Sequence, residues 1–294
     1  MRIAMKIGMA LVLVAFAVAA CEGDRAVTRE DTADPAAEAA AGETATGINL
    51  GDLADGWYRA AEEYDPEADW RNIVMIEVRS GEIVGGRWTA APKTGGPDKL
   101  TYSIDGGYNM ERVSQWPWHD QAEATIEHLI STQDPYDAEW DDDGVVDAIS
   151  GATMTVSYFF ELAREALSGE PFEPGPYNDG TYVGEGSAGD DWKDVVHITV
   201  IDGRIESVHW APEPVGGDGP DKYEYSVEGE YGMERVSQWP WHEQADAVAR
   251  FVIENQSLDN MDLDDEGETD AISGATITLS GFHAAASDAI AQAQ

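Results

Sequence analysis

The chain is short of thiols and of cations, and the shortage of thiols excludes whole classes of chemistry. Its 294 residues include one cysteine, Cys21, which lies close to the N-terminus. The rest of the chain therefore has no disulfide, no paired-thiol redox centre, no iron–sulfur ligands and no covalent haem attachment. Any redox chemistry in the folded part requires a cofactor that is brought in from outside.

Cations are outnumbered more than threefold. There are 17 Lys and Arg against 58 Asp and Glu, a formal net charge of −41 at pH 7. Such a chain repels nucleic acid and anionic membrane surfaces, so we expect no nucleic-acid partner. The sequence also lacks a nucleotide-binding glycine fingerprint, a catalytic triad and a metalloprotease motif, which favours a carrier over an autonomous enzyme.

The only long apolar run lies at the N-terminus. Arg2 and Lys6 precede an apolar stretch over residues 7–20, which is too short and wrongly flanked for a membrane span. It ends in Val-Ala-Ala-Cys, which resembles a bacterial lipobox, so residues 1–20 are interpreted as a lipoprotein signal peptide and Cys21 as the lipidated residue. A plain signal peptide with an incidental cysteine is the alternative. The lipidated form predicts a membrane-anchored, extracytoplasmic protein.

Residues 21–50 are predicted to form an acidic linker. This stretch is rich in Ala, Glu, Thr and Asp and has almost no large apolar side chain, so it cannot bury enough surface to fold alone. The sequence predicts two domains behind it, over residues 51–170 and 176–294, with the junction in the Gly- and Pro-containing stretch 168–175.

An internal duplication supports this division. Residues 108–122 read YNMERVSQWPWHDQA and residues 231–245 read YGMERVSQWPWHEQA, identical at 13 of 15 positions. The stretch DAISGATMT at 147–155 recurs as DAISGATIT at 270–278, 123 residues further on. A period of this length is typical of a duplicated domain rather than of a solenoid.

Both copies predict the same α+β fold, a small antiparallel sheet packed with helices. Asp202-Gly203 joins two β-rich runs as a two-residue hairpin, and Ser80-Gly81 does the same in the first copy. A helical period follows at 121–131 and at 244–256. An acidic loop, the Ser-Gly-Ala-Thr segment and a last amphipathic helix complete each copy.

The Ser-Gly-Ala-Thr segment is the strongest candidate site. Its small residues leave the threonine side chain unobstructed, and we expect it to lie at a helix N-terminus, which favours a bound phosphate. An ordinary threonine helix cap is the structural alternative. The repetition of seven identical residues argues against that alternative.

The pattern Asp-x-x-Ser-Gly-Ala-Thr resembles the FMN-binding domain of peripheral subunits of the Rnf and sodium-pumping NADH:quinone oxidoreductase complexes, and of electron-transfer surface lipoproteins. The resemblance covers residues 55–168 and 178–292. It implies an electron carrier with FMN in a phosphoester bond to Thr153 and to Thr276. The rest of the implied flavin-binding motif is Asp147, Ser150, Gly151, Ala152, Asp270, Ser273, Gly274 and Ala275.

The resemblance also implies partners: a flavin transferase that installs FMN, a membrane redox donor and an extracytoplasmic acceptor. The Glu-Thr-Pro-Gly stretch of the respiratory subunits is absent, and the Trp-Pro-Trp-His motif stands before the helix instead. A flavin-free surface lipoprotein that binds a ligand or partner remains the alternative. A flavin reductase acting on a small molecule is a weaker third possibility.

Three further features keep two interpretations each. The tryptophans of the two Trp-Pro-Trp-His motifs fill the core or stack on the flavin. The repeated cations, Lys99 with Lys222 and Arg112 with Arg235, offset the FMN charge or pair with surface carboxylates. The acidic loops at 139–144 and 262–267 resemble half of an EF-hand, so a calcium site is a hypothesis, although we assign no metal ligand.

The surroundings of the two threonines differ. When the two copies are aligned, Tyr-Phe-Phe at 158–160 corresponds to Gly-Phe-His at 281–283. If these side chains reach the flavin, the first site is drier, and we expect its flavin to be the harder one to reduce.

Overall fold

The computed structural model describes residues 47–294, except 111–113, 115, 142, 147 and 234–236. The described residues do not include the predicted signal peptide, Cys21, most of the predicted acidic linker, Asp147, Arg112 or Arg235. Within the described part of the chain, no helix is both long and apolar enough to cross a membrane.

The described residues form two successive groups of strands and helices, in the same order. The first group comprises η1 (Leu50–Asp52), β1 (Gly56–Ala61), β2 (Trp70–Arg79), β3 (Glu82–Pro92), α1 (Lys99–Ile104), α2 (Trp118–Thr132) and α3 (Ser157–Ser168). The second comprises β4 (Gly180–Ala188), β5 (Trp192–Ile201), β6 (Arg204–Trp210), β7 (Glu213–Pro214), α4 (Lys222–Val227), α5 (Trp241–Asn255), η3 (Asp259–Met261) and α6 (Ser280–Gln292).

Each group contains one antiparallel sheet. The first has the order β1-β2-β3, and the second has the order β4-β5-β6, with the short β7 paired to β5. Both predicted hairpins are confirmed: Ser80 and Gly81 have φ of 53° and 77°, and Asp202 and Gly203 have 56° and 75°. Positive φ at both central residues is the mirror-image turn that suits the twist of paired strands.

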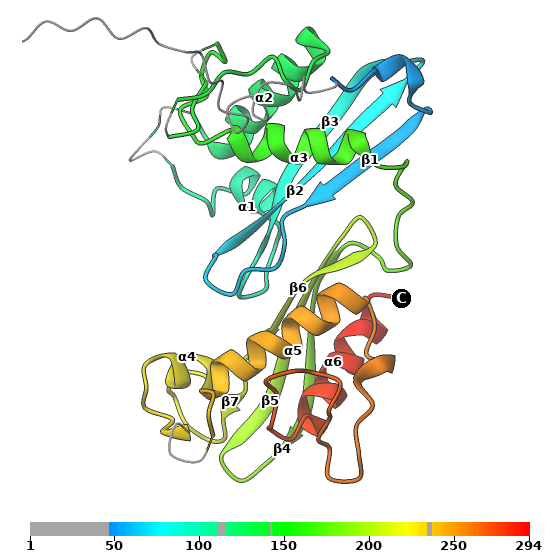
Figure 1. Cartoon of the computed structure of the whole chain (residues 1–294). Helices are drawn as coiled ribbons and strands as arrows, with labels where there is room; N and C mark the ends of the chain where they lie inside the picture. The colour runs from blue at the N-terminus through cyan, green and yellow to red at the C-terminus, as the bar shows by residue number, and fades with distance from the viewer. Residues whose placement is uncertain (1–46, 111–113, 115, 142, 147, 234–236) are drawn as a thin grey trace, which may run out of the picture. The chain divides into compact units, whose positions relative to one another are not determined.

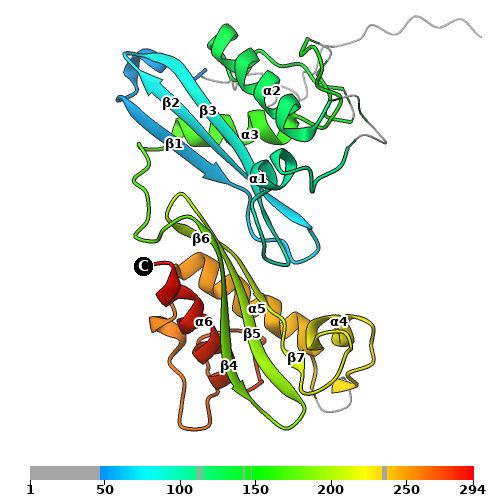
Figure 2. The same cartoon turned by 180° about the vertical axis from the view of Figure 1, so that it is seen from behind.

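Two long helices cover one face of each sheet, which confirms the α+β class (Figures 1 and 2). Helix α3 packs on β1 and β2 while α2 packs on β3, and α6 and α5 take the same places on the second sheet. The predicted apolar face of the last helix is correct, because Phe159, Leu162, Ala163 and Ala166 are all buried. Each copy therefore has its own core.

The short helices α1 and α4, and the first strand of each sheet, are elements that periodicity does not predict. Each helix begins after a repeated Pro-Asp pair, and the aspartate caps it: Asp98 accepts from the Thr101 amide and Asp221 from the Glu224 amide. Capping by Asp compensates the free amides of a first turn. Six residues are too few for a visible period of 3.6.

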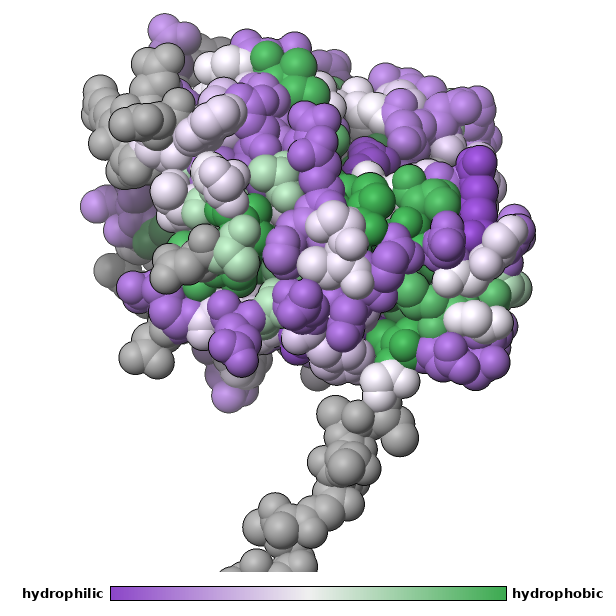
Figure 3. Space-filling view, turned by 90° about the horizontal axis from the view of Figure 1, so that it is seen from above, coloured by the Kyte–Doolittle hydropathy of each residue, from purple (hydrophilic) through white to green (hydrophobic). Residues whose placement is uncertain are grey.

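The surface agrees with the acidic composition. On the face shown in Figure 3, hydrophilic side chains break the apolar residues into separate patches. The large apolar side chains with the greatest exposure include Trp116, Trp239 and Tyr158. All three belong to segments near the Ser-Gly-Ala-Thr loops, whereas the two most exposed large apolar side chains, Ile104 and Val227, are the last residues of α1 and α4.

A buried charge cluster joins the two groups of elements. Arg59 and Arg71 of the first sheet both form ion pairs with the carboxylate of Glu206 on β6, whose side chain is 3% exposed. The Arg71 guanidinium also donates to the Glu206 carbonyl at 3.1 Å. Arg87 pairs with Asp202 at 2.5 Å. Three of the scarce cations are therefore used between the copies.

Candidate functional site

A buried glutamine holds each Ser-Gly-Ala-Thr loop in place. In the second copy, Oε1 of Gln244 accepts from the Thr276 amide at 2.7 Å and from the Thr276 hydroxyl at 3.2 Å. Its Nε2 donates to the Ser237 hydroxyl at 3.1 Å and to the Trp239 carbonyl at 3.0 Å. The side chain is fully buried. One amide therefore ties the threonine to the Trp-Pro-Trp-His segment.

The first copy repeats this arrangement. Oε1 of Gln121 accepts from the Thr153 amide at 2.8 Å, and its Nε2 donates to Ser114 at 3.0 Å and to the Trp116 carbonyl at 2.9 Å. The Thr153 hydroxyl donates to Ser114 at 3.1 Å. The two stretches that recur in the sequence are thus in contact with each other in each copy.

The rest of the motif leaves each threonine accessible. Thr153 and Thr276 are exposed, as are Ser150, Ser273 and Asp270, whereas Ala152 and Ala275 are buried under the loop. Gly151 and Gly274 have φ of 92° and 91°, a left-handed conformation that glycine adopts without strain. The loop therefore presents a hydroxyl on a backbone that is fixed by the glutamine.

The threonines are not at the helix start, which corrects the sequence prediction. Helices α3 and α6 begin at Ser157 and Ser280, and their caps are Val156 and Leu279, which make no side-chain capping bond. The amides of Val156 and Leu279 donate to Gly144 and Gly267. The helix-cap alternative for the threonines is therefore wrong, and the helix dipole does not point directly at the threonine.

A cavity of about 700 Å³ opens beside Thr276. It lies between the sheet and the Ser-Gly-Ala-Thr loop, and its rings come from Trp192, Trp210, Tyr231 and Trp241. Lys222 is the one cation among the described residues that line it. Four acidic residues, Asp190, Asp191, Asp194 and Glu268, also line it. The size of the cavity and its aromatic rings are typical of a cofactor site.

The repeated lysines lie against aromatic rings. Nζ of Lys222 is 4.8 Å from the ring centre of Tyr231 and 4.9 Å from that of Trp241. Nζ of Lys99 has the same environment, 4.6 Å from Tyr108 and 5.2 Å from Trp118. Among the described residues neither ammonium forms a close ion pair, and the aromatic rings stabilise both charges. The carboxylates of Glu62 and Asp194 still interact electrostatically with Lys99 and Lys222.

The tryptophans of the Trp-Pro-Trp-His motifs divide between the two interpretations. Trp118 and Trp241 are buried and pack against Trp88 and Trp210, with ring centres 5.4 Å and 4.8 Å apart. Trp116 and Trp239 are exposed beside the Ser-Gly-Ala-Thr loops. The histidines that follow are hydrogen-bonded, as expected: Nδ1 of both His119 and His242 lies 2.9 Å from a serine hydroxyl.

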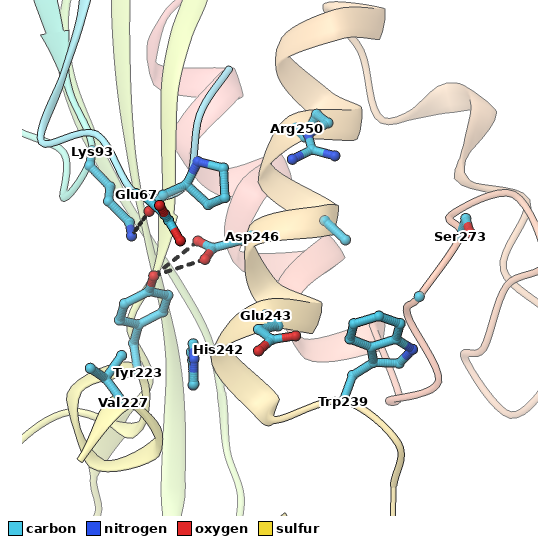
Figure 4. A pocket seen from close by; sticks show the side chains of 13 residues that line it. Glu67, Lys93, Tyr223, Val227, Trp239, His242, Glu243, Asp246, Arg250 and Ser273 are labelled. Atoms are coloured by element: carbon cyan, nitrogen blue, oxygen red, sulfur yellow. Dashed lines mark hydrogen bonds between the residues drawn. The ribbon is translucent and has the colours of Figure 1, made fainter. Parts of the chain in front are cut away.

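Another cavity, of about 690 Å³, lies beside α5 and reaches the second Ser-Gly-Ala-Thr loop at Ser273 and Gly274 (Figure 4). Ser273, Gly274 and Trp239 line it, but Thr276 does not. The Tyr223 hydroxyl lies 3.0 Å from both carboxylate oxygens of Asp246, and burial raises the pKa of both groups. Of these two cavities, only the one beside Thr276 is lined by the threonine of the motif.

The acidic half-loops do not gather into a metal centre among the described side chains. Oδ1 of Asp141 accepts from the amides of Asp143 and Val145, and Oδ1 of Asp264 accepts from those of Glu266 and Glu268. These carboxylates therefore close their own turns. The calcium hypothesis gains no support from this geometry.

Replacing the glutamine should uncouple the loop. In the Gln244→Leu variant, the Thr276 amide and the Trp239 carbonyl lose their buried partner. We expect unfolding to become easier by about 2–4 kcal/mol, the cost of unsatisfied buried groups. Urea denaturation measures this change. The matched Gln121→Leu variant should disturb only the first loop, and amide exchange at Thr276 that matches the wild type in Gln244→Leu would contradict the role.

The buried lysine should make stability depend on pH. Burial lowers the pKa of Lys99 to about 8, against an ordinary value of 10.5. Between these values the unfolded chain binds more protons, so this group's contribution to stability rises with pH. Lys99→Met should therefore be more stable than the wild type at pH 7 by about 1–3 kcal/mol, with the difference fading toward pH 10.5. Denaturant titrations at several pH values would contradict this if the difference stayed constant.

Comparisons with known proteins single out the same region. The model of the FMN-binding domain family matches residues 192–291, which include Thr276, Gln244 and Lys222. No curated protein matches the chain. A solution structure of a protein from Clostridium thermocellum is 46% identical over 40% of this chain and 91% of its own, with a TM-score of 0.32.

A crystal structure of a protein from Clostridium perfringens is 19% identical over 40% of this chain and 87% of its own, with a TM-score of 0.30. The residues matched by the family model include the Ser-Gly-Ala-Thr loop, the glutamine that holds it and the aromatic residues of the cavity beside it. The chain therefore contains an FMN-binding domain, over residues 192–291.

Proposed function

We propose that this chain is a membrane-anchored, extracytoplasmic electron carrier with one FMN linked through a phosphoester to Thr276 and a second to Thr153. The observation that carries the proposal is the exposed Thr276 hydroxyl at the edge of a cavity lined by aromatic rings and one lysine. The first copy supports the second attachment through the same loop, glutamine and serine.

The residues that line the cavity beside Thr276 fit FMN. The phosphate end requires a hydroxyl that is free on its outer side, and Thr276 offers one while its amide is held by Gln244. The planar ring system requires flat apolar surfaces, which Trp192, Tyr231 and Trp241 provide. The cofactor adds negative charge to a cavity that Asp190, Asp191, Asp194 and Glu268 also line, and Lys222 offsets part of that charge.

Bound FMN supplies reversible electron uptake that no side chain of this chain can provide. The chain's own residues would shield the flavin ring from water, fix the phosphate end of the cofactor and place a positive charge beside it. Both copies repeat the same loop, held by a buried glutamine, which favours a carrier with two similar redox sites. We propose a membrane redox donor and an extracytoplasmic acceptor as its partners.

Coexpression with an FAD-dependent flavin transferase tests this function. We expect the exported protein to show yellow fluorescence that survives denaturation, and an intact mass with two FMN increments. Expression without the transferase is the control and should give neither. Flavin that is lost on denaturation would argue for a non-covalent site, and the absence of any flavin would favour the flavin-free lipoprotein.

The anchor is tested independently of the flavin. Cys21→Ser should move the protein from the membrane fraction to the soluble fraction after export, because no acyl chain can be attached. Flavin loading should stay unchanged, since the residue belongs to the N-terminal segment. Immunoblots of the two fractions measure the shift. A wild-type protein that is wholly soluble after export would contradict the anchor.

A further inference from the structure

The first copy has its own cavity beside its repeated lysine, but that cavity is smaller. It encloses about 480 Å³, against about 700 Å³ beside Lys222. Trp70 and Lys99 line it in the places that Trp192 and Lys222 take in the second copy. Thr276 lines the cavity beside Lys222, whereas Thr153 is not among the described residues that line the cavity beside Lys99.

The two linings differ in the loop after the first strand, which supplies Glu62, Glu63, Asp65, Ala68 and Asp69 in the first copy, and at one residue near the start of the last helix. Tyr158 is the second residue of α3 and lines the Lys99 cavity with a side chain that is 47% exposed. Gly281 is the second residue of α6 and lines the Lys222 cavity together with Thr276. A ring therefore stands in the first copy where the second copy has a glycine with the Asp194 carboxylate packed against it.

The partner across from this residue differs as well. Oδ1 of Asp194 accepts from the Trp210 indole at 2.9 Å, and its Oδ2 lies 1.9 Å from where a Cβ on Gly281 would stand. A side chain at position 281 would therefore collide with this carboxylate. The second copy needs glycine there.

In the first copy, the corresponding residue is Asn72. It accepts from the Trp88 indole at 3.0 Å, and its amide nitrogen donates to Glu62 at 3.1 Å. Glu62 thus holds the amide by a hydrogen bond that Asp194, with no N–H to donate, cannot make. Asn72 occurs with Tyr158 and Asp194 with Gly281, so each copy has a matched pair that sets the shape of its cavity.

We propose that Tyr158 closes the Lys99 cavity to a flavin on Thr153, so that only the flavin on Thr276 lies beside its lysine. The proposal rests on the proposed function, because it assumes a flavin on each threonine. It assigns the two copies different tasks. The second flavin gains the electrostatic support of Lys222 when it is reduced, and the first flavin stays outside its cavity.

Lysine variants in single-flavin proteins test the proposal. Thr153→Ala leaves the second flavin alone, and Thr276→Ala leaves the first alone. At a fixed potential and pH 7, Lys222→Gln should lower the ratio of reduced to oxidised second flavin by about tenfold, the effect of one nearby charge. Lys99→Gln should leave the ratio for the first flavin unchanged. Redox titration followed by absorbance measures both ratios.

Opening the cavity beside Lys99 should make the reduction of the first flavin depend on the charge of Lys99. In a Tyr158→Gly background, which copies the residue of the second repeat, Lys99→Gln should lower the ratio for the first flavin as Lys222→Gln does for the second. Tyr158→Phe keeps the ring and is the matched control, so Lys99→Gln should remain without effect there. Glycine at this exposed helix position costs only about 1 kcal/mol, so the fold should survive.

Two outcomes overturn the proposal. The first is a change in the ratio for the first flavin on Lys99→Gln while Tyr158 is intact, because the ring would then not close the cavity. The second is the absence of coupling in the Tyr158→Gly background. Both differ from failure of the proposed function, in which the threonines carry no flavin and no titration can be recorded.

Discussion

Thr276→Ala should remove one FMN from the protein, Thr153→Ala should remove the other, and the double variant should carry none. In the proposed function the hydroxyl oxygen itself forms the ester, so no neighbouring group can replace it. The fold should persist, because the amide of residue 276 still donates to Gln244, and the lost hydroxyl bond is worth only about 1 kcal/mol. Intact mass and in-gel fluorescence after coexpression with the transferase measure the loss.

The next threonine along each loop gives a matched control. Thr278 also lines the cavity beside Thr276, and the Thr155 hydroxyl donates to the Asp143 carbonyl at 3.0 Å. Thr278→Ala and Thr155→Ala should therefore keep both FMN increments. Two increments in the Thr153→Ala, Thr276→Ala double variant would refute attachment at these threonines.

Glu206→Gln should destabilise the protein by about 3–5 kcal/mol, the usual cost of removing one partner from a buried charge group. The carboxylate pairs with both Arg59 and Arg71, whose side chains are 9% and 13% exposed. Nε of each arginine is already buried without a hydrogen-bond partner, and burial lowers the pKa of Arg59. The amide of Gln leaves these guanidinium charges uncompensated.

A more exposed pair on β2 of the first sheet is the control for this effect. Glu77 pairs with Arg79, whose side chain is 66% exposed, so Glu77→Gln should cost at most about 1 kcal/mol. Urea denaturation at equal ionic strength compares the two variants. Equal losses would contradict a special role for the buried cluster. A lower unfolding midpoint with two separate transitions for Glu206→Gln would show in addition that this cluster makes the copies unfold together.

The sequence predicts what is local or repeated. Both hairpins and all four long helices follow from turn residues and apolar period, although α2 and α5 begin three residues earlier than the period indicates. The duplication identifies the important stretches without their roles. Gln121 and Gln244 lie in the repeated 15-residue stretch and are identical polar residues on a predicted helix. That identity was the signal in the sequence that could have indicated their role. Their partners lie 32 residues away, a distance that no local pattern reports.

The charge cluster shows a second limit. Arg59, Arg71 and Glu206 are ordinary surface residues by type, and the copies differ at these positions, so the repeat gives no signal for them. Only the packed structure brings residues 135 and 147 positions apart into contact.

The sequence predicts that the first flavin is harder to reduce because its site is drier, and the structure does not support that reason. The argument that Phe159 and Phe160 dry the first flavin is wrong, because both side chains are fully buried in the core on α3. Tyr158 does reach a cavity. The expected order, with the first flavin harder to reduce, stays a prediction and now depends on whether each flavin reaches its lysine.

The most direct test of the central claim is to locate FMN on the chain by peptide mass spectrometry. The protein is isolated from cells that hold the flavin transferase, digested, and each peptide is fragmented to find the residue that bears the added mass. We predict FMN on the peptide that contains Thr276 and on the peptide that contains Thr153, with the increment on the threonine oxygen in each. Unmodified peptides at both positions, or FMN on other residues, would contradict the account.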